Sequence, residues 1–250
     1  MKYAFTTEYD IDYQGITPDL TLTFPRFIQL LQETSIRHTD STPFDMNWYA
    51  QNKRGFILLN WQAEVYGYPR FHDTLVVDTW PTLFKGMFAE RAFQARDKAG
   101  RVLALANTFW IYTDLSTRKP TRIEPTLLEG YGAVQPHPLE KDFTMPAPDA
   151  QFSLYEERAY TVTRRDTDSN GHVNNVVYLE WAEDLILDSV YDTTRVKRMK
   201  AAYKKECVRG MTASVEAFTK GGNSGEYLFR ISQKGEGIKE LLAEVWMLRS

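Results

Sequence analysis

The sequence predicts an α+β protein made of two similar halves, each with one helix packed against a meander of antiparallel strands. Two observations lead to this prediction. The same order of segments, a short acidic stretch, an amphipathic helix and several strand-like runs, occurs twice in 250 residues. Between the two occurrences, residues 120–148 hold six of the 11 prolines. Because proline removes a backbone donor and blocks helices, this segment is a connector.

Strand signals follow each helix and are the basis for the predicted sheets. The runs are rich in aromatic and β-branched residues and alternate in polarity, which favours antiparallel hairpins joined by turns such as 98–100 and 221–223. They cover residues 55–68, 73–80, 87–97 and 101–114 in the first half, and 201–208, 212–220, 226–233 and 240–249 in the second.

The helix of the second half indicates how these elements pack. From Val176 onward its polar residues are confined to Glu180, Glu183, Asp184 and Asp188, and apolar residues occupy most other positions. Such a helix, with a narrow polar stripe on a broadly apolar cylinder, needs cover on most sides. A curved antiparallel sheet provides that cover, so we expect each helix to lie in the hollow of a sheet.

Composition limits the classes of function. The chain is 43% hydrophobic and 25% charged with a net charge of −3, which gives no general reason to expect nucleic-acid binding. The single cysteine, Cys207, excludes an internal disulfide framework. No signal peptide and no apolar run long enough for a membrane span is visible, so we expect a cytoplasmic protein that makes no membrane contact. A homodimer is possible on the sequence alone.

The segment DTDSNGHVNN, which precedes the second helix, carries the most informative polar residues. Asp168, Asn170 and His172 stand at alternate positions directly before the helix. In the first half, a matching order of Asp, Gln and Gly continues with Ile16 where the second half has His172. The pattern indicates a duplication in which the first copy has lost its ionisable group.

The chain resembles the acyl-acyl carrier protein thioesterases. The segments that carry this resemblance are NWQAEVYGYPRFHDTLVVDTW, DTDSNGHVNNVVYLEW and YKKECVR, in this order along most of the chain. The resemblance implies two tandem hotdog domains, each a central helix wrapped by a curved antiparallel sheet. Residues 1–135 would form an acyl-chain-binding domain without catalytic residues, residues 136–152 the connector, and residues 153–250 the catalytic domain.

The resemblance further implies the activity and the residues responsible for it. Asp168, Asn170, His172 and Glu206 match the catalytic positions of the family, whose members hydrolyse fatty acyl thioesters of acyl carrier protein and end chain elongation. The family needs no metal or bound cofactor. The start of the chain, close to its first motif, suggests a bacterial-type member. Hydrolysis of acyl-CoA and binding of acyl thioesters without catalysis are the alternatives.

The residue types suit thioester hydrolysis. Asp168 can attack the thioester or activate water, His172 can move protons, and Asn170 would orient one of them. The first amides of the helix that follows would stabilise the oxyanion. Cys207 is an alternative nucleophile, but in an extended segment it and Glu206 point to opposite faces. The resemblance favours Glu206, which leaves Cys207 as a small buried residue.

Two further groups of residues are candidates for binding. Asn174 and Asn175 are either helix caps, for which asparagine is preferred, or contacts to the substrate. A run of cations next to Glu206 predicts a docking surface for an acidic carrier protein, with a solvated strand as the alternative. Its carrier-binding candidates are Arg195, Lys197, Arg198 and Lys200.

Overall fold

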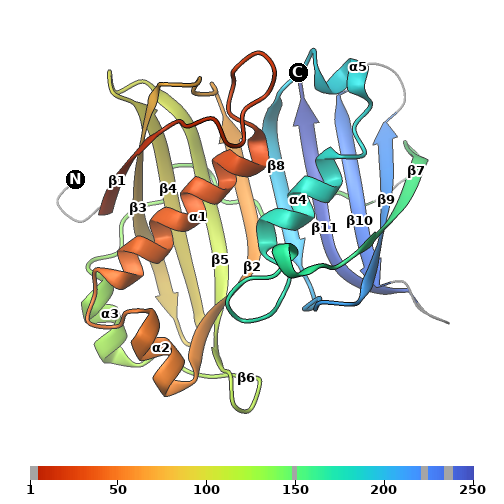
Figure 1. The fold of residues 1–250 in the computed structure, drawn as a ribbon. Helices are drawn as coiled ribbons and strands as arrows, with labels where there is room; N and C mark the ends of the chain where they lie inside the picture. Colours follow the sequence, from red (N-terminus) through yellow and green to blue (C-terminus); the bar gives the residue numbers. More distant parts are fainter. Residues whose placement is uncertain (1–4, 148–150, 221–224, 234–238) are drawn as a thin grey trace. The chain divides into compact units, whose positions relative to one another are not determined.

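The computed structural model describes residues 5–147, 151–220, 225–233 and 239–250. The chain divides into two compact units, Met1–Asp142 and Phe143–Ser250. The boundary between them falls inside the proline-rich segment that the sequence predicts as a connector. Each unit consists of antiparallel strands crossed by one main helix (Figure 1).

The first unit has a five-stranded antiparallel sheet in the order β1-β3-β4-β5-β2, and the short β6 extends β5. Its elements are β1 (Phe5–Asp10), α1 (Phe24–Asp40), α2 (Met46–Asn52), β2 (Arg54–Val65), β3 (Thr74–Lys85), β4 (Phe88–Asp97), β5 (Val102–Asp114), β6 (Lys119–Pro120) and α3 (Pro125–Tyr131).

Helix α1 lies across the strands of this sheet (Figure 1). Pro25 stands in its first turn, where a missing N–H costs nothing. Phe27, Ile28 and Leu31 are each 1% exposed, which the 3.6-residue period places on one side of the helix. Trp61 of β2 is fully buried and stacks on Phe93 of β4 with ring centroids 5.2 Å apart. The apolar stripe of α1 and the facing rows of the sheet form the core of the unit.

The second unit has the strand order β8-β11-β10-β9-β7, and every pairing in it is antiparallel. Its elements are β7 (Phe152–Thr161), the 3-10 turn η1 (Arg164–Asp166), α4 (Asn175–Glu183), α5 (Asp188–Tyr191), β8 (Val196–Tyr203), β9 (Thr212–Lys220), β10 (Glu226–Gln233) and β11 (Glu240–Arg249).

Helix α4 is shorter and more deeply buried than the sequence predicts. It ends at Glu183, and a separate short helix, α5, begins at Asp188. Seven of its nine residues, from Val176 to Glu183 with only Glu180 excepted, are buried. The prediction of a helix covered on most sides is confirmed. The placement of Glu183 on a solvated polar stripe is wrong, because this carboxylate points into the unit.

The buried Glu183 pairs with the arginine at the end of the last strand. Arg249 Nη1 donates to Glu183 Oε1 over 2.9 Å, with side chains 1% and 8% exposed respectively. The Arg249 guanidinium also donates to the backbone oxygen of Thr194 over 3.0 Å and stands 5.0 Å from the ring centroid of Tyr191. The Arg249 guanidinium at the end of β11 thereby contacts both the last residue of α4 and the last residue of α5.

The acidity of Glu183 makes stability depend on pH. Burial raises the pKa of this carboxyl to about 7, although the nearby Arg249 guanidinium opposes the shift. The folded state therefore holds a proton that the unfolded chain, with a pKa near 4.5, has released, and stability falls as pH rises from 4.5 to about 7. When the free energy of unfolding is measured in urea at a series of pH values, Glu183→Gln should lack the part of the fall in stability that Glu183 causes. An unchanged pH profile in that variant would contradict the assignment.

Most strands lie where the sequence predicts them. Strands β9, β10 and β11 have the predicted bounds, and β2 to β5 overlap the predicted runs. Strand β8 is the error: it begins at Val196 and ends at Tyr203, whereas the sequence favours 201–208. Strands β1 and β7 and the helices α2 and α3 are not predicted. The predicted turn at 98–100 joins β4 to β5, with Gly100 at φ 87°; the one at 221–223 lies outside the described residues.

Candidate active site

The segment before α4 is a tight turn that presents its polar side chains at the surface. The Gly171 N–H donates to Asp168 O over 3.0 Å, and Asp168 N–H donates to His172 O over 2.8 Å. Gly171 takes φ 79°, a left-handed conformation that suits glycine. The chain therefore reverses direction within the triplet, so the alternate spacing of Asp168, Asn170 and His172 does not correspond to an extended segment.

Asp168 holds this turn together with one of its two carboxylate oxygens. Its Oδ1 accepts from the backbone N–H of Asn170 over 2.8 Å and from that of His172 over 3.3 Å. The side chain is exposed, and within the described part of the chain Oδ2 has no partner. The side chain of Asn170 contacts neither Asp168 nor His172 there, so the structure does not give it the orienting contact that we expected.

The structure brings His172 and Glu206 together from separate parts of the second unit. His172 Nε2 and Glu206 Oε2 are 3.2 Å apart, and their side chains are 28% and 42% exposed. A β-bridge between His172 and Val208, and a hydrogen bond of 2.8 Å from Val173 N–H to Cys207 O, hold the two segments in register. An imidazole and a carboxylate that are in contact and open to solvent can bind and exchange a proton.

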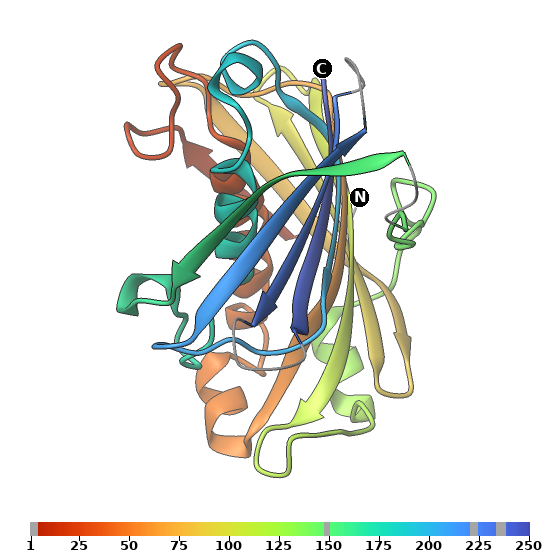
Figure 2. The same cartoon turned by 90° about the vertical axis from the view of Figure 1, so that its right-hand side faces the viewer.

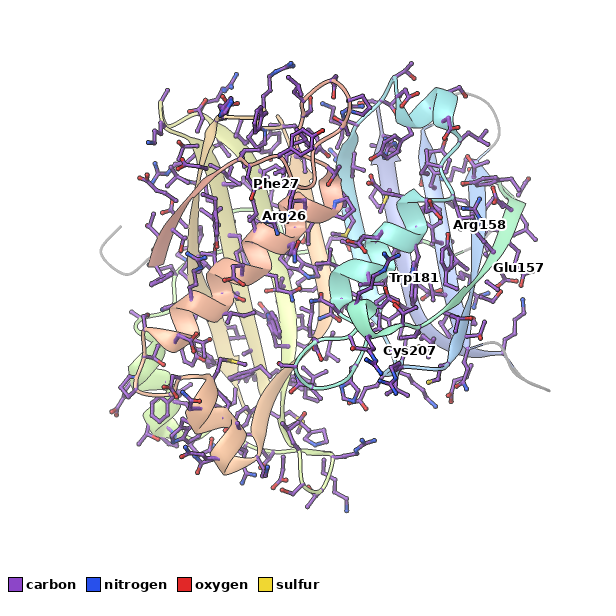
Figure 3. The ribbon with its side chains drawn as sticks, viewed as in Figure 1. Arg26, Phe27, Glu157, Arg158, Trp181 and Cys207 are labelled. Carbon is purple, nitrogen blue, oxygen red and sulfur yellow. The ribbon has the colours of Figure 1, made fainter. Side chains whose placement is uncertain are left out.

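Cys207 lies beside this pair but faces the interior. It is 1% exposed, and Figure 3 shows it near the start of α4, whereas Glu206 is exposed. Burial raises the pKa of the Cys207 thiol, which disfavours the thiolate that nucleophilic attack requires. The prediction that the two residues point to opposite sides is confirmed, although strand β8 ends before them at Tyr203.

The two asparagines occupy the N-terminus of α4. Asn174 is the N-cap, and its side chain accepts from Val176 N–H over 3.0 Å. The Val177 N–H donates to Asn174 O, so the amide of Asn175 is the first-turn donor that lacks an acceptor among the described residues. The cap interpretation is thus confirmed for Asn174. Only one amide, not the whole first turn, is open to a developing oxyanion.

Sequence reasoning missed two tyrosines that support this end of the helix. Tyr203, the last residue of β8, donates from its hydroxyl to Asn175 O over 3.0 Å. Its ring lies 5.7 Å from that of Tyr178, which is 3% exposed. The signal in the sequence is weak, because Tyr178 stands in an apolar run where tyrosine also serves as ordinary core, and Tyr203 stands between two alanines and two lysines.

The cations predicted to bind the carrier lie just before and along β8. The pairing of β8 with β11 skips Lys197, which stands at a β-bulge between Val196 and Arg198. Lys200 Nζ donates to Thr144 O over 3.0 Å and lies 5.9 Å from the Trp246 ring centroid. Arg195 donates to backbone oxygens, among them that of Tyr191. Two of the four cations therefore make contacts within the second unit, and docking by this group stays a prediction.

A different set of cations surrounds the His172–Glu206 pair. Val162 pairs with Gly210 and Met211 through hydrogen bonds of 3.0 and 2.9 Å, which places the turn η1 beside the loop after Glu206. Apart from Lys205, which pairs with Glu240, the exposed cations on the turn and on the segment on either side of Glu206 are Arg164, Arg165, Lys204 and Arg209. We call this group the rim cluster. Among described residues, its only ion-pair contact is a long one of 3.9 Å between Arg165 and Asp166.

Two domain models of one sequence family together match most of the chain. Residues 2–131 match the acyl-ACP thioesterase N-terminal domain, and residues 150–245 match the acyl-ACP thioesterase C-terminal domain. The chain belongs to the acyl-ACP thioesterase family. The loop with Asp168, Asn170 and His172 and the residue Glu206 all lie within the C-terminal match.

Curated relatives in this family are plant proteins of greater length. The chain is 24% identical to a chloroplastic acyl-[acyl-carrier-protein] hydrolase of Cuphea viscosissima, covering 94% of this chain and 61% of that protein. It is 23% identical to the chloroplastic oleoyl-acyl carrier protein thioesterase 1 of Arabidopsis thaliana, covering 87% and 68%. The chain thus spans about 61% of the length of the first of these relatives.

Solved structures of the family show the same fold. An acyl-ACP thioesterase from Bacteroides thetaiotaomicron superposes with a TM-score of 0.86 at 22% identity, covering 100% of this chain and 98% of that one. The 12:0-ACP thioesterase from Umbellularia californica gives a TM-score of 0.85 at 18% identity, covering 99% and 97%. The predicted α+β fold with tandem hotdog units is confirmed.

Neither a cluster of metal-ligating side chains nor a membrane-spanning helix is found among the described residues. No group of three histidine, cysteine, aspartate or glutamate side chains in residues 5–147, 151–220, 225–233 and 239–250 could hold a metal ion. Within the same ranges, no helix is both long and apolar enough to cross a bilayer.

Proposed function

We propose that this acyl-ACP thioesterase family member hydrolyses fatty acyl thioesters of acyl carrier protein and releases the free fatty acid. The contact between His172 and Glu206 is the observation that carries the proposal. In this proposal the pair transfers protons, and the carboxylate oxygen Oδ2 of Asp168 and the amide of Asn175, which belong to the same segment as His172, take part in the reaction. These four groups supply a base, a proton carrier and an oxyanion donor, which thioester hydrolysis needs.

In the proposed reaction, Asp168 either attacks the thioester carbon and forms a mixed anhydride that water then hydrolyses, or removes a proton from water that attacks the thioester carbon directly. Its Oδ1 remains bound to two backbone amides, so Oδ2 is the reactive oxygen. Glu206 accepts from His172 and holds the imidazole in place, and His172 protonates the leaving thiolate. Asn170 lies at the open side of the turn, where its amide can reach the substrate. No step in this account needs a metal or a bound cofactor.

The first unit has a similar turn at residues 12–16, but it lacks a histidine that could transfer protons. Asp12 Oδ1 accepts from Gln14 N–H over 3.0 Å, as Asp168 does from Asn170, and Gly15 takes φ 73°. Ile16 replaces the histidine. We propose that the first unit binds the acyl chain and that catalysis belongs to the second unit.

The direct test is incubation of the protein with a panel of acyl-carrier thioesters, followed by identification of the released acids. Parallel reactions with the matching acyl-CoA thioesters separate carrier-protein hydrolysis from CoA hydrolysis. Release of acid from the carrier substrates at higher kcat/KM supports the proposal. Tight binding of acyl thioesters without any release would instead support a non-catalytic binding protein.

The rim cluster is the proposed docking surface for the acidic carrier protein and for the phosphate of its prosthetic arm. Exposed charges of this kind mainly raise the association rate and are screened over about 8 Å at physiological salt. Arg165→Glu plus Arg209→Glu should lower kcat/KM for carrier substrates by about tenfold or more at low salt, and added salt should reduce the difference. Turnover of a short neutral thioester should hardly change.

Two charge-matched variants complete this experiment. Lys98→Glu plus Lys119→Glu reverses two exposed cations of the first unit and should leave both substrates unaffected. Lys197→Glu plus Arg198→Glu tests the strand cations, and because they stand on β8, outside the rim cluster, the effect should be smaller than that of the rim variant. Equal losses on carrier and neutral substrates would show that the rim residues act structurally.

A further inference from the structure

Tyr178 on α4 carries a hydroxyl group that is nearly buried and has no partner within the described chain. The residue is 3% exposed. Its oxygen makes no hydrogen bond to a described residue, and it is not one of the fully enclosed polar atoms, so a small group can still reach it. By contrast, the hydroxyls of Tyr155 and Tyr203 donate to backbone oxygens over 2.8 and 3.0 Å. Because a buried hydroxyl without an acceptor is costly, we expect that of Tyr178 to bind an acceptor from outside the chain.

The helical geometry directs this hydroxyl toward the first turn of α4. Tyr178 follows Asn175 by three positions, and residues three apart lie on the same side of a helix. Helical side chains lean toward the N-terminus, so the Tyr178 ring extends toward the end of α4 at which the Asn175 amide is open. The hydroxyl and this amide therefore belong to the same end and the same side of the helix.

Two aromatic rings hold the Tyr178 side chain in place. Helix α4 lies on one side of the strands of the second unit (Figure 2). From that helix the Trp181 ring stands 5.4 Å from the Tyr178 ring, and from the end of β8 the Tyr203 ring stands 5.7 Å away, both edge to face. Tyr203 is itself fixed, because its hydroxyl donates to Asn175 O over 3.0 Å. The Tyr178 hydroxyl is therefore pre-oriented and needs little rearrangement to bind an acceptor.

The surroundings keep this hydroxyl protonated and place it next to the candidate site. Burial raises the pKa of the Tyr178 hydroxyl, and the nearby Cys207 and Glu206 raise it further through the negative charge of their ionised forms. Both residues belong to the segment that the hydrogen bond from Val173 N–H to Cys207 O joins to the start of α4. At neutral pH the hydroxyl is therefore a hydrogen-bond donor on the side of the helix start where Glu206 stands.

The start of α4 offers a single open backbone donor to the oxyanion that thioester hydrolysis creates. Among the described residues this donor is the amide of Asn175, because Asn174 accepts from the amides of Val176 and Val177. Sites for acyl transfer direct several donors at this oxygen, and tyrosine hydroxyls are among the side chains that serve. A protonated, unpaired tyrosine hydroxyl at the same end of the helix can supply a second donor.

We propose that the Tyr178 hydroxyl donates to the carbonyl oxygen of the thioester and, with the Asn175 amide, stabilises the oxyanion. Attack on the carbonyl carbon forms one bond there and moves the π pair of C=O on to oxygen, where the two donors meet the charge. When C=O forms again, the C–S bond breaks and the sulfur leaves with its electron pair. Tyr178 keeps its proton throughout and acts by hydrogen bonding alone. The proposal rests on the proposed function, which supplies the thioester.

Tyr178→Phe removes only the hydroxyl and keeps the ring contacts, so the variant should fold. Its kcat on acyl-carrier thioesters should fall by about 10²-fold, the lower end for loss of one oxyanion donor, and KM should change little. A rise in KM at unchanged kcat would show that the hydroxyl binds substrate and transition state equally. That result, or an unchanged kcat and KM in the folded variant, would overturn the proposal.

Tyr155→Phe is the matched control for this variant. It removes a hydroxyl of the same unit that donates within the protein, to Leu185 O over 2.8 Å. The loss of that bond should lower the free energy of unfolding in urea and leave kcat unchanged, whereas Tyr178→Phe should lower kcat and leave stability unchanged. Equal losses of kcat in the two variants would point to general loosening of the second unit and contradict the role of Tyr178.

A binding experiment decides the proposal separately from turnover. Its two series of ligands are acyl amides of pantetheine, in which NH replaces the thioester sulfur, and alkyl thioethers of pantetheine with the same chain lengths, which lack the carbonyl group. Tyr178→Phe should weaken binding of the amides by about three- to tenfold, as for one hydrogen bond, and leave the thioethers unaffected. Equal effects on both series would refute the proposal. A protein that binds the amides through Tyr178 but releases no acid from thioesters would contradict the proposed function alone.

Discussion

Replacement of His172 by Ala, or of Glu206 by Gln, should lower kcat on acyl-carrier thioesters by about 10²–10⁴-fold, the range for a general acid-base group. Both substitutions break the 3.2 Å contact that the proposed proton transfer uses. Both side chains are partly exposed, so the variants should remain folded. Single-turnover assays of acid release, with circular dichroism to confirm folding, provide the measurement.

Cys207→Ala is the matched control for these variants. It changes the residue next to Glu206 but removes only a buried sulfur, so activity should remain within a few-fold of the original protein. A folded Cys207→Ala protein without activity would favour a thiol mechanism in which Cys207 is the nucleophile. That result would also require the thiol to leave its buried position during the reaction.

Replacement of Arg249 by Leu should destabilise the protein by about 3–5 kcal/mol, the cost of leaving one partner of a buried ion pair alone. The variant leaves Glu183, whose side chain is 8% exposed, without the guanidinium that it bonds and with only the weaker electrostatic influence of Arg195. The free energy of unfolding in urea is the quantity to measure. The loss should become smaller as pH falls, because burial raises the pKa of the lone carboxyl and Arg249 no longer lowers it.

Two further variants separate charge burial from general damage at this position. Glu183→Leu combined with Arg249→Leu removes both charges and should recover much of the stability. Arg37→Ala breaks the exposed pair with Glu33, whose side chains are 49% and 44% exposed, and should cost less than about 1 kcal/mol. If the double variant were as unstable as Arg249→Leu, packing rather than the unpaired charge would explain the loss.

The ion pair also shows what the sequence could not reveal. The helical period correctly identifies α4 as a covered helix, but it assigns Glu183 to the polar stripe because a carboxylate usually faces water. Its partner Arg249 lies at the end of the last strand, and no local pattern connects the two. The error at β8 has a related cause. Lys197, Arg198 and Lys200 make the strand look like a loop, while Met199 among them and Ala201 directly after them are buried.

The candidate site was predictable in its members but not in its geometry. The family resemblance selects His172 and Glu206, and the structure places them in contact. Extended alternation fails for Asp168 and Asn170 because Gly171 adopts a left-handed conformation and turns the chain. The segment 135–142 illustrates the same limit: prolines identify a connector, but its attachment depends on side chains of four separate strands, β2 to β5.

The retained turn of the first unit offers a built-in reference for experiments on the second. Asp12 and Asp168 make the same side-chain bond to the amide two residues later, but the residue four positions after Asp12 is Ile16 and the one after Asp168 is His172. Replacement of Asp168 by Ala would therefore remove a structural acceptor together with the oxygen proposed to react. Replacement of Asp12 by Ala would remove the acceptor alone. Comparing Asp12→Ala with Asp168→Ala would divide the effect of that carboxylate between folding and chemistry.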